Sequence, residues 1–149
     1  MKINFFFEDV SFVLKDKGKL RLWIAACIAA EGFRLKQINF IFCSDEYLLD
    51  LNKKFLNHDY FTDVITFSHE SSNISKEVGG DVFISYDRIA DNALNLKIHE
   101  SDEVHRVMVH GVLHLMGYKD KTKADKNSMS ALEDDCLLRR AFEDSNLAI

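Results

Sequence analysis

The sequence predicts an α/β (α+β) fold: a single compact domain in which a small mixed β-sheet of about four strands packs with about five helices. Along the chain, segments with the alternating apolar pattern of strands are followed by segments in which apolar residues recur every three or four positions, as in helices. Of the 149 residues, 47% are hydrophobic, which is enough apolar material for one core. The chain has no Pro and no internal repeat, so residues 1–149 are expected to form one domain.

The first half of the chain is expected to supply two strands and two helices. Residues 2–7 form the first strand, and the apolar spacing over residues 20–28 predicts a helix that Gly32 can end. In residues 37–43 both alternating sets of side chains are mostly apolar, which predicts a strand buried on both faces. Ser44 can cap the next helix, because a serine hydroxyl accepts a bond from a free backbone N–H of the first turn.

The second half begins with two further strands, at residues 64–67 and 81–85. The polar segment 71–80 between them is the best candidate for a mobile loop, since it is rich in Ser, Asn and Gly. Residues 86–98 follow with the apolar spacing of a helix.

The two last helices close the expected fold. Ser101 can cap a helix that is apolar on almost every side up to Met116, so this helix should be central and buried. Thr122 is the expected cap of the last helix, which starts at about Ala124.

Charge and composition limit the classes of function. A formal net charge of −5 argues against non-specific wrapping of nucleic acid, and no DNA partner is expected. No signal peptide and no apolar run of membrane-spanning length is found, so a cytoplasmic protein without a membrane partner is expected. The cysteines, Cys27, Cys43 and Cys136, lack CxxC spacing and are expected to be buried and unbonded.

The segment from His110 to Asp120 has the residue types and spacing of a metal-binding site. His110 and His114 lie four residues apart and therefore share one face of a helix. Gly117 lets the chain turn back, so that Asp120 can return a carboxylate to the same point. Three protein ligands are typical of a catalytic zinc site, because the fourth position stays open for water or substrate. We expect one Zn²⁺ per chain, or another divalent transition metal.

The sequence HGVLHLMGYKD at residues 110–120, with the upstream segments 51–52, 62–67 and 79–82, resembles the YbeY family of bacterial metallo-endoribonucleases. The match runs in order along nearly the whole chain. The resemblance implies a small α/β fold around a single zinc and cleavage of single-stranded RNA. It also implies roles in 16S ribosomal RNA 3′-end maturation and ribosome quality control, with the small ribosomal subunit as partner.

This sequence departs from the family pattern at two positions. The third metal ligand of most members is a histidine, whereas Asp120 stands here, and a carboxylate oxygen is also an accepted zinc ligand. Many relatives carry an arginine where this chain has Leu56, so a phosphate contact by that residue does not carry over. Lys53 or Lys54 could substitute only as flexible point charges.

The metal can promote attack by water or by the 2′-hydroxyl of RNA, and the sequence leaves both routes open. His58, Asp63 and Asp81 are possible bases, but residues of this kind are more often turn, cap or surface residues, and no catalytic residue beyond the metal ligands is assigned. The lysines around the motif, Lys119, Lys121, Lys123 and Lys126, form a small basic cluster.

Three rival functions remain. A zinc peptidase is disfavoured, because Gly111 stands where HExxH enzymes have their glutamate. An iron oxygenase would share two histidines and a carboxylate, but it needs a scaffold that this pattern does not indicate. The third rival is a ribosome-assembly binding factor with a structural metal, and the absence of arginine at Leu56 keeps it open.

Overall fold

A computed structural model describes residues 1–70 and 75–140 of the chain. The described part contains four strands, β1 (Ile3–Phe7), β2 (Arg34–Cys43), β3 (Val64–Ser68) and β4 (Glu77–Ser85). It also contains five helices, α1 (Lys17–Ala30), α2 (Asp45–Leu56), α3 (Tyr86–Leu96), α4 (Glu100–Leu115) and α5 (Lys123–Leu138). The predicted α+β fold, with about four strands and about five helices, is confirmed.

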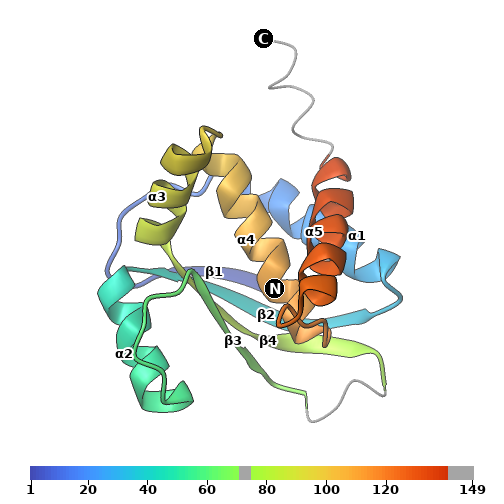
Figure 1. Ribbon diagram of the computed structural model, residues 1–149. Coiled ribbons are helices and arrows are strands. Elements are labelled where there is room, and N and C mark those ends of the chain that lie inside the picture. Colours follow the sequence, from blue (N-terminus) through green and yellow to red (C-terminus); the bar gives the residue numbers. More distant parts are fainter. Residues whose placement is uncertain (71–74, 141–149) are drawn as a thin grey trace.

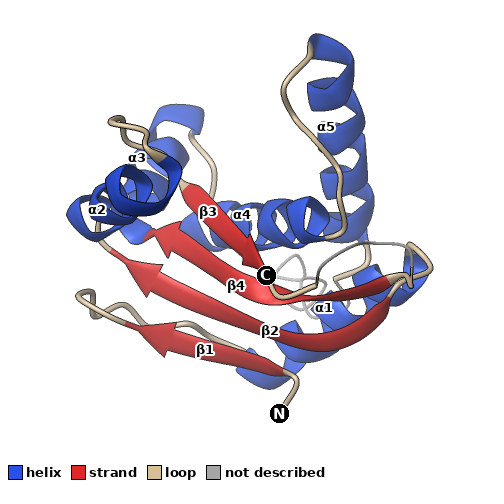
Figure 2. Cartoon of the chain, turned by 90° about the horizontal axis from the view of Figure 1, so that it is seen from below, coloured by secondary structure: helices blue, strands red, loops and turns tan. Residues whose placement is uncertain are grey.

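The strands form one mixed sheet in the order β1-β2-β4-β3 (Figure 2). Strands β1, β2 and β4 run parallel, and β3 pairs antiparallel with β4. Parallel neighbours need crossover connections, which α1 provides between β1 and β2. The short strand β3 is one edge of the sheet, next to β4, and both strands contact α4.

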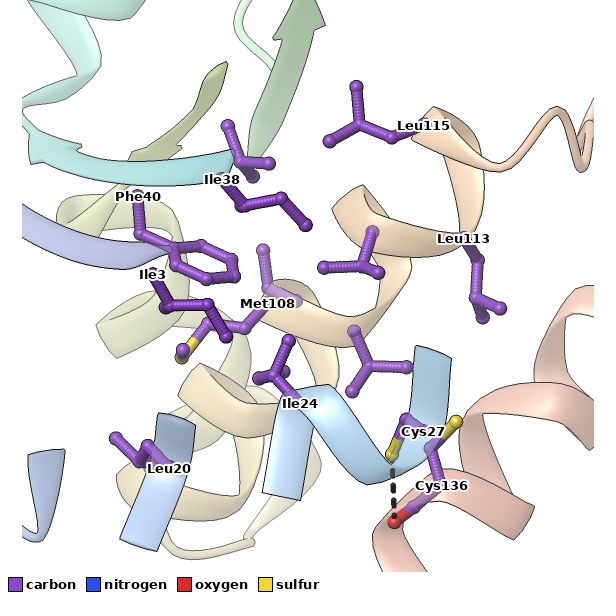
Figure 3. Close-up of a cluster of buried hydrophobic side chains, with 14 of the residues drawn as sticks. Ile3, Leu20, Ile24, Cys27, Ile38, Phe40, Met108, Leu113, Leu115 and Cys136 are labelled. Carbon is purple, nitrogen blue, oxygen red and sulfur yellow. Dashed lines mark hydrogen bonds between the residues drawn. The ribbon is translucent and has the colours of Figure 1, made fainter. Parts of the chain in front are cut away.

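The main core lies between one face of the sheet and the helices above it (Figure 1). Alternate residues of β2 point into it, among them Ile38 and Phe40, where they meet Ile24 of α1 and Met108 of α4 (Figure 3). The helix α4 has ten buried residues and contacts α3, α5, β3 and β4. The prediction of a central, buried helix is therefore confirmed.

The opposite face of the sheet has a smaller apolar cluster and a row of polar side chains. Leu48 of α2 packs there against Cys43 and Ile65. The polar row joins Asn39 to Asp81 at 3.0 Å, and Asp81 to His69 at 3.1 Å. Burial of β2 on both faces, expected for residues 37–43, holds for Ile38 and residues 40–43, whereas Gln37 is exposed and Asn39 is half-buried. This strand also begins at Arg34, three residues before the expected start.

The helix caps confirm two predictions and correct one. Ser44 accepts a hydrogen bond from the Tyr47 N–H at 3.2 Å, and Thr122 caps α5 with the predicted side-chain geometry. Ser101 is not the cap of α4, because His99 is the N-cap residue and the helix begins at Glu100. The carbonyl of His99 already accepts the first helical bonds, so Ser101 lies inside the first turn.

Two other boundaries differ from the sequence prediction. The expected loop 71–80 is shorter, since β4 begins at Glu77, where pairing with Arg34 of β2 extends the sheet; residues 71–74 lie outside the described residues. The helix expected over 86–98 ends at Leu96, because Lys97 adopts a left-handed conformation. None of the described helices is long and apolar enough to span a bilayer.

Candidate metal centre

The three predicted metal ligands lie together at the end of α4. The Nε2 atoms of His110 and His114 are 3.0 Å apart, and they lie 3.2 and 3.3 Å from Oδ2 of Asp120. One ligand atom from each residue therefore faces a common point, as a single metal ion requires. The convergence agrees with the predicted spacing, and occupation by a metal stays a prediction.

The local sequence explains this convergence. The helix α4 carries both histidines one turn apart on the same side. It ends at Leu115 with Met116 as its C-cap residue, and Gly117 follows with φ of 103°, a left-handed conformation that favours glycine. The N–H of Tyr118 donates to the carbonyl of Leu113 at 3.1 Å, which satisfies the helix end and turns the chain back. Asp120 then reaches the histidines from the returning loop.

The candidate site is partly open to solvent. The side chains of His110 and His114 are 21% and 25% exposed, and that of Asp120 is 38% exposed. The rest of α4 is largely buried, so the imidazoles lie at the rim of the core. A three-ligand site with this exposure leaves room for water or substrate, as catalytic rather than structural metal sites do.

Each histidine also has a partner on the side away from this point. Nδ1 of His110 lies 2.6 Å from Oε2 of Glu133 in α5, and Nδ1 of His114 lies 3.0 Å from the carbonyl of Tyr118. Metal-binding histidines usually donate their second N–H to such acceptors, which leaves the other nitrogen free for the metal. Both contacts were missed by the sequence analysis. A glutamate on the apolar side of α5, between Met129 and Cys136, was the signal for the first of them.

The electrostatics of the site favour a cation. Burial alone would lower the pKa of His110, but the hydrogen bond to Glu133 and the neighbouring carboxylates outweigh it, and its pKa is raised. Burial raises the pKa of Asp63, against the opposing influence of His110. Burial likewise raises the pKa of Glu103. The charges of Glu133, Asp63 and Asp120 all favour a positive charge at His110, and the nitrogen and oxygen donors suit a divalent transition metal.

The helix position next to His110 excludes peptidase geometry. A Cβ atom added to Gly111 would lie 2.5 Å from Cγ1 of Val82 and 3.4 Å from Cγ2 of Val64. This position faces the sheet, so a glutamate there would have no room beside β3 and β4. The peptidase alternative therefore fails on packing as well as on sequence.

The structure separates the three possible bases. Asp63 immediately precedes β3 and lies close enough to His110 to affect its pKa. Asp81 points to the opposite face of the sheet, since Val82 beside it faces α4, and Asp81 pairs with His69. His58 accepts or donates a bond with the Tyr60 hydroxyl at 3.0 Å. Asp63 is thus the candidate base whose charge helps to raise the pKa of His110.

The fold and the site define a class of protein: a one-sheet α+β domain with a His/His/Asp cluster that can hold a metal. Residues 10–140 match the family model described as Endoribonuclease YbeY. This chain belongs to that family, as the sequence resemblance indicated.

Individual relatives agree with this placement. The Endoribonuclease YbeY of Cytophaga hutchinsonii is 46% identical over 140 residues, which cover 94% of this chain and 96% of the relative. The Endoribonuclease YbeY of Porphyromonas gingivalis is 43% identical over 92% of this chain and 89% of its own length. A solution structure of a Thermotoga maritima protein has a TM-score of 0.65 at 21% identity, and covers 97% of this chain and 92% of that one. The last comparison supports the fold alone.

Proposed function

We propose that this chain is a metal-dependent endoribonuclease that cuts single-stranded RNA, with one Zn²⁺ held by His110, His114 and Asp120. The convergence of two Nε2 atoms and one carboxylate oxygen within 3.3 Å of one another, at a partly exposed surface, carries the proposal. Membership of the endoribonuclease YbeY family supports RNA as the substrate.

The residues of this chain would hold and orient the reacting groups. When bound, a divalent ion supplies Lewis acidity that stabilises the negative charge developing on a phosphodiester under attack. The two imidazoles present neutral nitrogen donors, and their bonds to Glu133 and to the Tyr118 carbonyl keep those donors aimed at one point. The buried helix behind them limits movement of the ligands.

Cationic side chains lie beside the candidate site. Lys119 and Lys121 flank Asp120 and are exposed, and Lys123 begins α5. Exposed lysines bind backbone phosphates without reading sequence. Lys53 is paired with Asp59 at 3.5 Å, whereas the lysines of the returning loop lie next to Asp120 in the sequence, so they are further candidates for a phosphate contact.

Exposed rings in the segment before Asp63 favour an unpaired strand. Tyr60 and Phe61 are 55% and 50% exposed, and they lie in the segment that leads to Asp63. The ring of His58 stacks on Tyr60 with centroids 5.1 Å apart. Unstacked bases of single-stranded RNA pack on such rings, whereas bases inside a duplex cannot reach them.

The experiment compares metal-loaded protein on a single-stranded RNA and on a duplex that contains the same strand. The variant His114→Ala and a chelated sample remove the site in two independent ways. His69→Ala is the matched control, because His69 pairs with Asp81 on the opposite face of the sheet. We expect cleavage of the single strand by the wild type and by His69→Ala, with about one equivalent of zinc by elemental analysis.

Two outcomes would contradict the proposal. Cleavage that persists equally in His114→Ala and after chelation would come from a contaminating nuclease. A wild type that is inert although it carries zinc and still associates with ribosomes would favour the second candidate, a ribosome-assembly binding factor. The observation behind that candidate is Leu56, which lies at the end of α2 without an arginine to contact phosphate.

The cellular role that we propose is maturation of the 3′ end of 16S ribosomal RNA on the small ribosomal subunit, in the cytoplasm. The sequence resemblance suggests this role, and family membership is consistent with it. Mapping of 16S 3′ ends in cells depleted of the protein tests it. Unprocessed ends should accumulate, and the wild type but not His114→Ala should remove them; normal ends in depleted cells would refute the role.

A further inference from the structure

Glu133 is a buried carboxylate whose two oxygens are both occupied. The residue is 7% exposed and lies on the inner side of α5, between Met129 and Cys136. Oε1 accepts a hydrogen bond from Arg106 at 2.8 Å, and Oε2 lies 2.6 Å from Nδ1 of His110. A buried charge costs free energy unless it is paired, so these contacts explain how a glutamate is tolerated there.

We propose that Glu133 is a positioning residue for the metal centre, an inference that rests on the proposed function. The Nδ1–H of His110 donates to Glu133, which leaves the lone pair of Nε2 facing His114 and Asp120. The carboxylate therefore fixes both the tautomer and the ring orientation of His110. A carboxylate in this place also increases the electron density on the ligating nitrogen.

The two histidines are held by different kinds of acceptor. His114 donates to the backbone carbonyl of Tyr118, which the turn at Gly117 places without help from another helix. His110 depends instead on a side chain from α5, 23 residues further along the chain. The orientation of His110 thus depends on the packing of α5 against α4 (Figure 1).

Arg106 holds Glu133 in place from α4. It lies one helical turn before His110, and its two terminal nitrogens bind Glu133 at 2.8 Å and Asp134 at 2.7 Å. The guanidinium thereby ties α5 to α4 directly beside the His110 contact. Because Arg106 occupies Oε1, only Oε2 is left for His110, and the carboxylate has one orientation that satisfies both partners.

Asp134 provides a matched control for Glu133. Both acids are on α5 and both bind Arg106. The side chain of Asp134 is 62% exposed, and the bond to Nδ1 of His110 comes from Glu133 instead. If Glu133 mattered only as an anchor for Arg106, neutralising either acid would have a similar effect. If it acts through His110, only its own substitution should disturb the metal.

The experiment measures the dissociation constant of Zn²⁺ by competition with a chromophoric chelator for the wild type, Glu133→Gln and Asp134→Asn. Gln keeps the size of the side chain and removes its charge. We expect binding to weaken roughly 10- to 100-fold in Glu133→Gln, the range typical of such outer partners, and to change less than about twofold in Asp134→Asn. The absorption spectrum of the Co²⁺-substituted protein should shift only in Glu133→Gln.

A second measurement needs no variant of Glu133. Nitrogen-15 NMR of metal-free wild type, above the titration of its histidines, should find the proton of His110 on Nδ1, with His110→Ala for assignment. Three results would each overturn the inference. They are a zinc affinity of Glu133→Gln equal to that of the wild type, a weakening of zinc binding in Asp134→Asn as large as in Glu133→Gln, and a proton on Nε2 of His110. A wild type that binds no zinc would instead defeat the proposed function, and the tautomer would still report on Glu133.

Discussion

Substitution of Gly111 by alanine tests how closely α4 packs on the sheet beside His110. The new Cβ would lie 2.5 Å from Cγ1 of Val82, closer than such atoms approach in real proteins, and 3.4 Å from Cγ2 of Val64. Val82 is fully buried and β-branched, so it has few alternative rotamers. The helix or the strand must therefore shift.

The magnitude follows from two opposing effects. Overpacking of a filled core costs about 1–3 kcal/mol. Alanine is more favourable than glycine inside a helix by up to about 1 kcal/mol, which offsets part of that cost. Because the clash is with a buried side chain that has few alternative rotamers, we place the cost at about 2–3 kcal/mol, which leaves a net loss of about 1–2 kcal/mol in Gly111→Ala. The Tm should then fall by about 2–8 °C for a chain of this size.

Urea and thermal unfolding of the metal-free proteins measure the effect. Gly18→Ala in α1 is the matched control, because a Cβ there meets nothing within 4 Å, and it should be as stable as the wild type or slightly more stable. Val82→Ala should cost less stability in the Gly111→Ala background than in the wild type, with a coupling free energy of about 0.5–3 kcal/mol. A Gly111→Ala protein as stable as the wild type would refute the packing argument.

Two further predictions concern a buried histidine and the third ligand. Burial and the neighbouring Arg140 lower the pKa of His105 to about 4, so this side chain stays neutral in the folded protein. As the pH falls from about 6.5 towards 4, the unfolded chain takes up the proton first, and about 3 kcal/mol of the free energy of unfolding should be lost. Above about pH 6.5 this part of the stability should be fully present. Urea midpoints at pH 7 and 5 should differ less in His105→Gln than in the wild type, and an identical pH dependence would contradict this. Asp120→Asn should bind zinc more weakly and gain less thermal stability from added zinc, since a charged ligand is lost; unchanged zinc content and melting would remove Asp120 from the site.

The convergence of His110, His114 and Asp120 could be predicted because the geometry is local. Two histidines four residues apart share a helix face wherever the helix lies, and Gly117 followed by Asp120 completes the set within one turn of chain. The predicted caps Ser44 and Thr122 also depend only on neighbouring residues, and both are confirmed.

Predictions that depended on distant partners were less accurate. The segment before Asp81 reads as a polar loop, yet Glu77 joins β4 because Arg34 of β2 pairs with it 43 residues away. Ser101 is a good cap by composition, but the tight connection after Lys97 starts α4 at Glu100. In the first case a distant partner, and in the second the conformation of the preceding turn, decided between local alternatives of similar free energy.

Glu133 and Gly111 extend the same argument from the fold to the chemistry. From the sequence, Gly111 shows only that the glutamate of a peptidase is absent. In the structure, its missing side chain is what allows α4 to lie directly against Val82. Glu133 has no local relation to His110, so the direction of α5 had to be known before its carboxylate could be assigned to the imidazole. The candidate ligands are thus brought together by helix geometry, and the proposed orientation of His110 depends on the packing of α4 between the sheet and α5. Substitutions that move α5 without touching a ligand should therefore weaken metal binding, while substitutions on the polar row beside Asp81 should not.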